Sequence, residues 1–169
     1  MNATWLARPE ASDDVRAIRE VNLAAFPTAT EADMVDALRA SRAWLEGLST
    51  VAQDAEGTVV AHALLTRCHV DGAPALALAP CAVLPAVQRQ GAGSAAIRAG
   101  LESARAMGEN LVLVLGHAEY YPRFGFAPAS GFAIRPPFEV PDEAMMALSL
   151  DPRAETPRGT IAYPAPFGV

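Results

Sequence analysis

The sequence predicts one α/β domain, residues 1–169, built on a mixed, mostly antiparallel β-sheet. Residues 76–107 begin with closely spaced apolar side chains, pass through a loop with two glycines and continue in a helical pattern that ends at Gly108. Residues 58–70 and 75–83 are two strand-like runs joined by a turn, which indicates an antiparallel hairpin. Residues 111–115 are all apolar, as in a strand that is covered on both faces.

Length and charge narrow the class of protein. A chain of 169 residues can bury a substantial core within a single domain. No apolar run approaches the roughly 20 residues of a membrane-spanning helix, and the N-terminal residues lack a signal-peptide pattern, so we expect a cytoplasmic protein without a membrane partner. A net charge of −6 argues against a nucleic-acid partner. The cysteines and histidines show no metal-ligand spacing, and no metal is expected.

Shorter elements complete the predicted domain. In chain order they are a strand at 4–8, helices beginning near Ser12 and Thr30, the second of which reaches Trp44 and Leu45, a strand at 48–52, a helix at 94–107 and a strand from Phe126. Residues 132–135 and 144–150 are predicted to be the last pair of adjacent strands. Residues 151–169 hold four prolines and are predicted to form a tail that packs on the domain.

The hairpin has a predicted register. If it is regular, opposed residues have numbers that sum to 145, which places His62 opposite Val83 and His69 opposite Leu76. Pro80 lies inside the second strand, where it removes a backbone donor. It therefore indicates either a bulge or an edge position.

The loop at residues 88–93 predicts an anion site. It leads into a helix, and the first turn of a helix has unpaired N–H groups and the positive end of the helix dipole. Gly91 and Gly93 allow a ligand to approach the backbone closely. A ligand that carries phosphate is the first hypothesis.

The basic residues exclude two classes of phosphate-binding protein. All 13 are arginine, so a P-loop NTPase and a protein kinase both lack their phosphate-binding lysine. The match to the dinucleotide-binding fingerprint is weak, because Gly91-Ala92-Gly93 is followed by Ala96 and no suitable acidic residue stands near position 113.

At this point the chain resembles the GNAT superfamily of acyl-CoA-dependent N-acetyltransferases, in particular a bacterial branch of predicted members. Gln88, Gly91 and Gly93 match the pyrophosphate loop Gln/Arg-x-x-Gly-x-Gly/Ala between a strand and a helix. The segment from Tyr120 to Phe126 matches a second signature, an aromatic-Tyr pair followed by three residues and Gly-Phe. The two signatures occur in the family's order.

The resemblance implies a fold and a cofactor. The sheet would be splayed at its centre, with helices on both faces, and the first two helices would border the acceptor site. Acetyl-CoA would be the co-substrate, and an amine on a small molecule or a peptide would be the acceptor. A homodimer is possible. The implied cofactor-binding residues are Ala82, Val83, Leu84, Gln88, Arg89, Gln90, Gly91, Ala92, Gly93, Ser94 and Tyr121.

Acetyl transfer to an amine requires three groups, and the sequence offers candidates for each. A backbone N–H near Ala82 or Val83 would bind the developing oxyanion, and Tyr121, at the family's tyrosine position, would protonate the CoA thiolate. The base stays open between His117, His62, Glu119 and an ordered water. The leading catalytic assignment is Tyr121 with His117.

Two further hypotheses stay open beside the enzyme. One is a non-catalytic acyl-CoA-binding or sensory module of the same fold, and the other is a GNAT-like subunit that acts through an interface.

Overall fold

The computed structural model describes residues 4–169. Its strands are β1 (Leu6–Pro9), β2 (Ser49–Gln53), β3 (Val59–Val70), β4 (Ala73–Val83), β5 (Leu111–Leu115), β6 (Ala127–Pro128), β7 (Ile134–Arg135), β8 (Met145–Ser149) and β9 (Gly159–Ala162). Its α-helices are α1 (Val15–Ala25), α2 (Thr30–Arg39) and α3 (Ala92–Ala106). The main path of the sheet is β1-β2-β3-β4-β5-β8-β6, and only the β4–β5 contact along it is parallel. The prediction of a mixed, mostly antiparallel sheet is confirmed.

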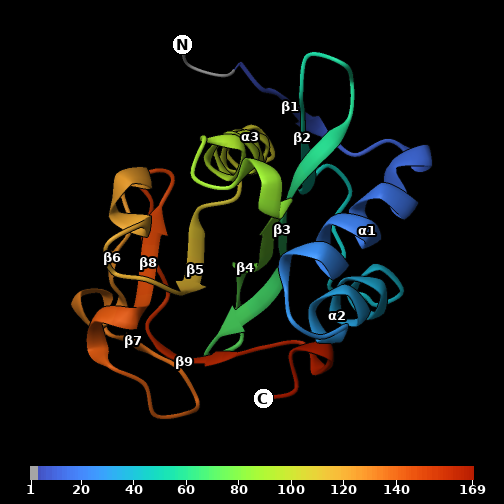
Figure 1. Cartoon of the computed structure of the whole chain (residues 1–169). Helices are drawn as coiled ribbons and strands as arrows, with labels where there is room; N and C mark the ends of the chain where they lie inside the picture. The colour runs from blue at the N-terminus through green and yellow to red at the C-terminus, as the bar shows by residue number, and fades with distance from the viewer. Residues whose placement is uncertain (1–3) are drawn as a thin grey trace.

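Helices cover both faces of the sheet, as expected (Figure 1). Ala61, Ala63 and Leu65 of β3 share a core with Ile97 and other apolar residues of α3. Leu64, one residue out of phase, lies in the core formed with α1 and α2. Successive side chains of a strand point to opposite faces, so β3 separates the two layers.

The predicted register of the β3–β4 hairpin is wrong. Val70 pairs with Ala73, so the turn holds only Asp71 and Gly72, both with positive φ (45° and 83°) as in a tight primed hairpin turn. Ala73 and Pro74, which the sequence placed in the turn, extend β4 instead. His69 therefore faces Pro74, not Leu76.

A bulge in β4 changes the register again. Ala63 pairs with Cys81 but Leu65 with Leu78, so Ala79 and Pro80 together oppose Leu64. Pro80 thus marks a bulge, because its missing N–H cannot contribute to the ladder. His62 consequently faces Ala82 rather than Val83.

Two further predictions of elements are wrong. The strand at β7 does not pair with β8, since β8 pairs with β5 and β6, while β7 pairs in parallel with β9. Only Ile134 and Arg135 of the predicted segment are extended, because Ala133 is left-handed and two prolines follow. Helix α2 also stops at Arg39 and does not reach Trp44, since the Ser41 hydroxyl donates to the Leu38 carbonyl and accepts from the Ala43 N–H.

The C-terminal segment lies along the domain. Strand β9 pairs with the end of β3 through His69–Ala162 and Val70–Ile161, and the Ile161 side chain is buried. The short turn Ala165–Phe167 then ends the chain close to α2 (Figure 1). Between residues 4 and 169, no helix combines the length and apolar character needed to cross a bilayer.

Candidate functional site

The site begins where β4 and β5 separate. These strands pair only at Leu76–Val112 and Ala77–Leu113, although β4 continues to Val83 and β5 to Leu115. The expectation of a sheet splayed at its centre is thus confirmed. On the other side of β4, the Leu84 N–H donates to the Val60 carbonyl at 2.9 Å. Strand alternation then turns the Ala82 amide toward β3 and the Val83 amide toward the gap.

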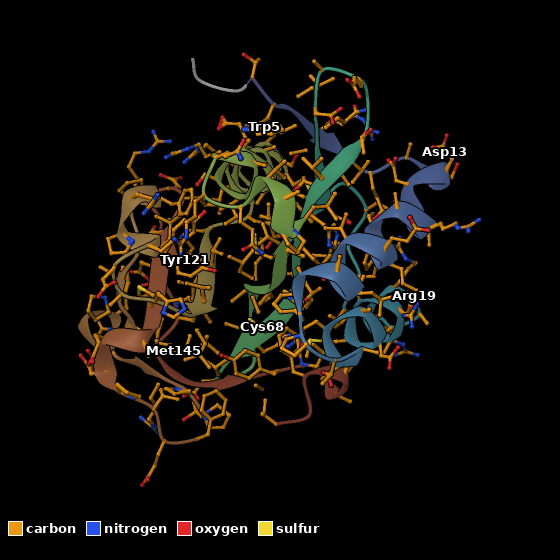
Figure 2. All side chains as sticks on the ribbon, in the orientation of Figure 1. Trp5, Asp13, Arg19, Cys68, Tyr121 and Met145 are labelled. Carbon is orange, nitrogen blue, oxygen red and sulfur yellow. The ribbon has the colours of Figure 1, made fainter. Side chains whose placement is uncertain are left out.

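Helix α3 starts at the open end of this gap. Gly91 precedes the helix with φ 92° and Arg89 has φ 64°, and no side chain among residues 4–169 caps the first N–H groups. Positive φ values close together in a loop turn successive N–H groups to one side, which forms an anion-binding concavity. Trp5 donates from Nε1 to the Gln90 carbonyl at 2.9 Å and lies over the start of α3 (Figure 2), so it holds the loop in this shape.

Gly93 allows the helix start to lie directly against β4. A Cβ at this position would stand 2.9 Å from Val83 Cγ2 and 3.7 Å from Cys81 Sγ. The Gln88 side chain also donates to the Val83 carbonyl at 3.2 Å. The loop, the helix start and the splayed strand therefore form one surface.

This surface lines a pocket of about 630 Å³, which we call the first pocket. Its lining residues are Cys81, Val83, Gln88, Arg89, Gly91, Ala92, Gly93, Ser94, His117, Tyr120, Tyr121 and Arg123. Most of the residues that the sequence predicted for a cofactor are brought together here. Ala82, Leu84 and Gln90 are absent from the lining. Ala82 and Leu84 direct their amides to β3, and the Gln90 carbonyl accepts a hydrogen bond from Trp5.

Tyr121 lies at the inner end of the first pocket. Its ring rests on Gly116, where a Cβ would come within 2.3 Å of Cε2, and meets Phe126 edge-on at 5.9 Å between ring centroids. The ring is seen beside β5 in Figure 2. Burial, and then the neighbouring Cys81 and Tyr120, raise the pKa of Tyr121 above its usual range, so the phenol keeps its proton at neutral pH.

Tyr120 and Arg123 were not predicted as site residues. The Tyr120 hydroxyl and the Ser94 Oγ form a hydrogen bond of 2.8 Å, which ties the tyrosine segment to the first turn of α3. Arg123 stacks on the Tyr120 ring at 4.2 Å from its centroid. The adjacent tyrosines thus differ: Tyr120 already has a hydroxyl partner, whereas no hydrogen bond joins the Tyr121 hydroxyl to another residue of the described chain.

A second pocket, of about 310 Å³, continues from the first. Its lining residues are Phe26, Glu31, Met34, Leu78, Ala79, Pro80, Cys81, Val114, Leu115, Tyr121 and Phe167. Cys81 and Tyr121 belong to both linings. The second pocket therefore meets the first at the bulge of β4.

Glu31 is a site residue that the sequence analysis missed. It lies in the first turn of α2, where acids are common at any helix start, so its position alone carried no signal. Its Oε2 atom is buried and finds no hydrogen-bond partner among residues 4–169. Only the packing of α2 against the C-terminal segment and β4 shows that Glu31 faces a pocket.

The three residues considered as a base lie in different surroundings. His117 lines the first pocket and not the second, and Glu119 lines neither. His62 is fully buried between Ser49 Oγ (2.9 Å from Nε2) and Asn22 Nδ2 (3.3 Å from Nδ1). Burial, with a smaller contribution from Arg39, lowers the pKa of His62 to about 3, so this histidine is a neutral structural group.

Cys81 is a protonated thiol at the junction of the pockets. Burial raises its pKa to about 12, which makes it a weak nucleophile. In the described part of the chain, no cluster of three or more His, Cys, Asp or Glu side chains could hold a metal ion.

Comparisons with known proteins all point to the same family. The family model for the acetyltransferase (GNAT) family matches residues 15–126. The chain is 40% identical over 153 residues, 85% of its own length and 84% of the relative, to the uncharacterized N-acetyltransferase YjhQ of Escherichia coli (strain K12).

Solved structures agree with this match. The GNAT family N-acetyltransferase YhbS from Escherichia coli, solved in complex with CoA, superimposes with a TM-score of 0.90 at 26% identity, over 100% of this chain and 94% of that one. A GNAT family acetyltransferase from Brucella melitensis, in complex with acetyl-CoA, gives 0.78 at 32% identity over 98% and 99% of the two chains. The fold, the two signatures and these relatives lead to one conclusion: the chain belongs to the GNAT family of acetyltransferases.

Proposed function

We propose that this protein transfers the acetyl group of acetyl-CoA to an amine, with Tyr121 as the acid. The neutral nitrogen of the amine attacks the thioester carbonyl, the new N–C bond replaces the C–S bond, and Tyr121 protonates the leaving thiolate. The surplus proton of the nitrogen passes to solvent, and solvent returns a proton to the Tyr121 phenolate. One observation carries the proposal: the first pocket runs from the start of α3, along the split between β4 and β5, and meets the second pocket at Cys81 and Tyr121. In this arrangement acetyl-CoA can enter through the first pocket and the amine through the second, and the two meet beside Tyr121.

The residues at the start of α3 fit a diphosphate. The first-turn N–H groups have no partner within the helix and no side-chain cap from the described part of the chain, and Arg89 adds a positive charge beside them. Gly91 and Gly93 leave the backbone open to a close ligand. Acetyl-CoA, when bound, supplies an acetyl thioester. The free amide groups on the gap side of β4 would hold its extended arm.

The Val83 N–H is our candidate for the oxyanion donor. Its neighbour Ala82 directs its amide to β3, which leaves Val83 facing the gap. A fixed N–H group that points at developing negative charge stabilises it without reorganisation.

Tyr121 is our candidate for the acid. Its pKa is raised, so the phenol carries a proton to donate, and its hydroxyl is free of other partners in the described chain. It lies where the two pockets meet. His117 lies on the first-pocket side, four residues before Tyr121, which supports a contact with the coenzyme rather than with the amine.

A thiol-release assay with acetyl-CoA tests the proposal. The panel holds small amines, polyamines, amino acids and peptides, and acetyl-CoA binding is measured separately by calorimetry. We expect binding together with turnover of at least one amine. Binding without turnover of any amine would instead favour the non-catalytic acyl-CoA-binding module. Absence of binding would refute both readings.

A further inference from the structure

The second pocket has an unusual composition for an acceptor site. Eight of its lining residues have purely apolar side chains apart from one thioether: Phe26, Met34, Leu78, Ala79, Pro80, Val114, Leu115 and Phe167. Glu31 is the single charged residue of the lining. At about 310 Å³ the pocket is at the small end of the range of ligand sites.

Leu115 shows that the apolar surface is available. It ends β5, and its side chain is 47% exposed, unlike the preceding residues of that strand, which are buried. Together with the other apolar side chains of the lining, it forms a concave apolar surface that an apolar ligand can cover.

Glu31 has no partner in the described chain that would neutralise it. The other acids of α2, Asp33 and Asp36, both pair with Arg19 on the outer side of the helices, but Glu31 forms no ion pair with residues 4–169. Its Oε2 is buried without a hydrogen-bond donor. A buried carboxylate oxygen without a donor is costly, and a ligand ammonium group supplies the missing donor.

We infer that the acceptor is a small amine with one positive charge on an apolar body, and that Glu31 binds its ammonium group. The inference rests on the proposed function, since it takes the second pocket as the acceptor's place. The carboxylate holds the charged end near the junction at Tyr121 and Cys81, while Leu115, Met34 and Phe167 cover the apolar body. The bound ammonium group releases one proton to solvent before its nitrogen attacks the thioester.

The same lining disfavours other amines. A polyamine would bring further ammonium groups into an apolar wall that offers them no acid. A free amino acid would bring a carboxylate toward Glu31, and a peptide would bring amide groups that the apolar side chains cannot bond.

The test measures binding to the protein–CoA complex by calorimetry, so that it does not depend on turnover. The probes are 2-phenylethylamine, hexylamine, spermidine, phenylalanine and the neutral 2-phenylethanol. We expect the two monoamines to bind at least about tenfold more tightly than the other three, because one charge-assisted hydrogen bond is gained and no second charge is buried.

Variants of the pocket test whether Glu31 is the residue that binds the ammonium group. Glu31→Gln should weaken monoamine binding by about 10- to 100-fold and leave CoA binding unchanged. Glu20→Gln, which changes an exposed acid on the outside of α1, is the matched control and should change neither. Leu115→Ala, at an exposed position, should weaken 2-phenylethylamine binding more than binding of spermidine.

The outcomes separate this inference from the proposed function. Monoamine binding that persists in Glu31→Gln, or tighter binding of spermidine or phenylalanine, would overturn the inference while acetyl transfer stands. If the wild-type protein did not bind CoA, the proposed function itself would be refuted. Selective monoamine binding that depends on Glu31 supports the inference even before any turnover is measured.

Discussion

Burial sets the protonation of the residues at the junction of the two pockets. Cys81 and Tyr121 are both partly buried, and this burial raises the pKa of each. The thiol is therefore unreactive, and the phenol remains a proton donor at neutral pH. This difference in chemical role favours direct attack by the amine over a mechanism that acetylates Cys81.

Replacing Tyr121 by Phe tests the acid. We expect kcat to fall by about 10²- to 10⁴-fold, because the leaving thiolate no longer receives a proton, while acetyl-CoA binding changes little. Steady-state kinetics and calorimetry measure the two quantities. The control is Tyr163→Phe, which removes a hydroxyl bonded to Met145 Sδ at 3.7 Å, outside both pockets. Equal kcat for wild type and Tyr121→Phe would remove Tyr121 from this role.

His62 predicts a pH dependence of stability. Its pKa is about 3 in the folded chain, against an ordinary value of about 6.5, so between these values the unfolded chain binds more protons. The free energy of unfolding therefore falls as pH falls through this window, by up to ~1.4 kcal/mol per pH unit from this group. Above about pH 6.5 the contribution is complete and constant.

Chemical denaturation of wild type and His62→Gln at several pH values measures this slope. The difference between the two proteins isolates His62, since all other titrating groups are shared. We expect the variant to lose less stability than wild type between about pH 6 and pH 4. Parallel curves would show that His62 is protonated in the folded protein.

At the scale of elements, the start of α3 can be tested through Gly91. A valine here must adopt φ 92° and would bring its Cβ to 3.8 Å from Nε1 of Trp5, the side chain that holds the loop, so we expect the loop to be distorted and acetyl-CoA binding to be lost. Gly108 is the matched control, because its φ of 82° brings the same backbone strain but its Cβ would meet nothing within 4 Å and it lies outside the first pocket. Both variants should lose about 1–3 kcal/mol of stability. Micromolar acetyl-CoA binding by Gly91→Val would contradict the assignment.

The sequence predicts those elements that are determined by residues close together in the chain. The strand, glycine loop and helix at 76–107 and the strand at 111–115 follow from apolar spacing and from two glycines, and the structure contains them. The hairpin register does not follow, because the two-residue turn at Asp71-Gly72 and the bulge at Pro80 each shift the pairing. The tight turn moves the partner of His69 by two residues, from Leu76 to Pro74, and the bulge leaves the partner of His62 one residue away, at Ala82 instead of Val83.

The sequence predicts the first pocket better than the second. Gln88, Gly91 and Gly93 lie within one short loop, so their common role shows as a motif. The second pocket is assembled from α1, α2, β4, β5 and the C-terminal turn, from Phe26 to Phe167. Glu31 has no local sign of its role, since an acid in the first turn of a helix is ordinary.

At the scale of the whole molecule, the C-terminal segment completes the second pocket. Strand β9 pairs with β3, and this pairing carries Phe167 to the wall opposite β4 and β5. The last residues of the chain thus border the proposed acceptor and not the proposed coenzyme. A change there should separate the binding of the two substrates.

Phe167→Ala tests this separation. We expect KM for the amine to rise by about 5- to 30-fold through lost apolar contact, with acetyl-CoA binding unchanged. Initial-rate kinetics with each substrate varied in turn gives both values. Phe138→Ala, which alters a ring stacked on Tyr163 and outside both pockets, is the control. An equal change in acetyl-CoA binding would show that the segment supports the fold rather than the acceptor.

The central claim is that the start of α3 binds a diphosphate and directs a thioester into the split between β4 and β5. A crystal structure of the protein with acetyl-CoA tests it most directly. The account predicts the diphosphate on the N–H groups of residues 91–94 and the thioester carbonyl within hydrogen-bond distance of the Val83 N–H, beside the Tyr121 hydroxyl. Acetyl-CoA bound elsewhere, or a split that stays closed by side chains in its presence, would contradict the account.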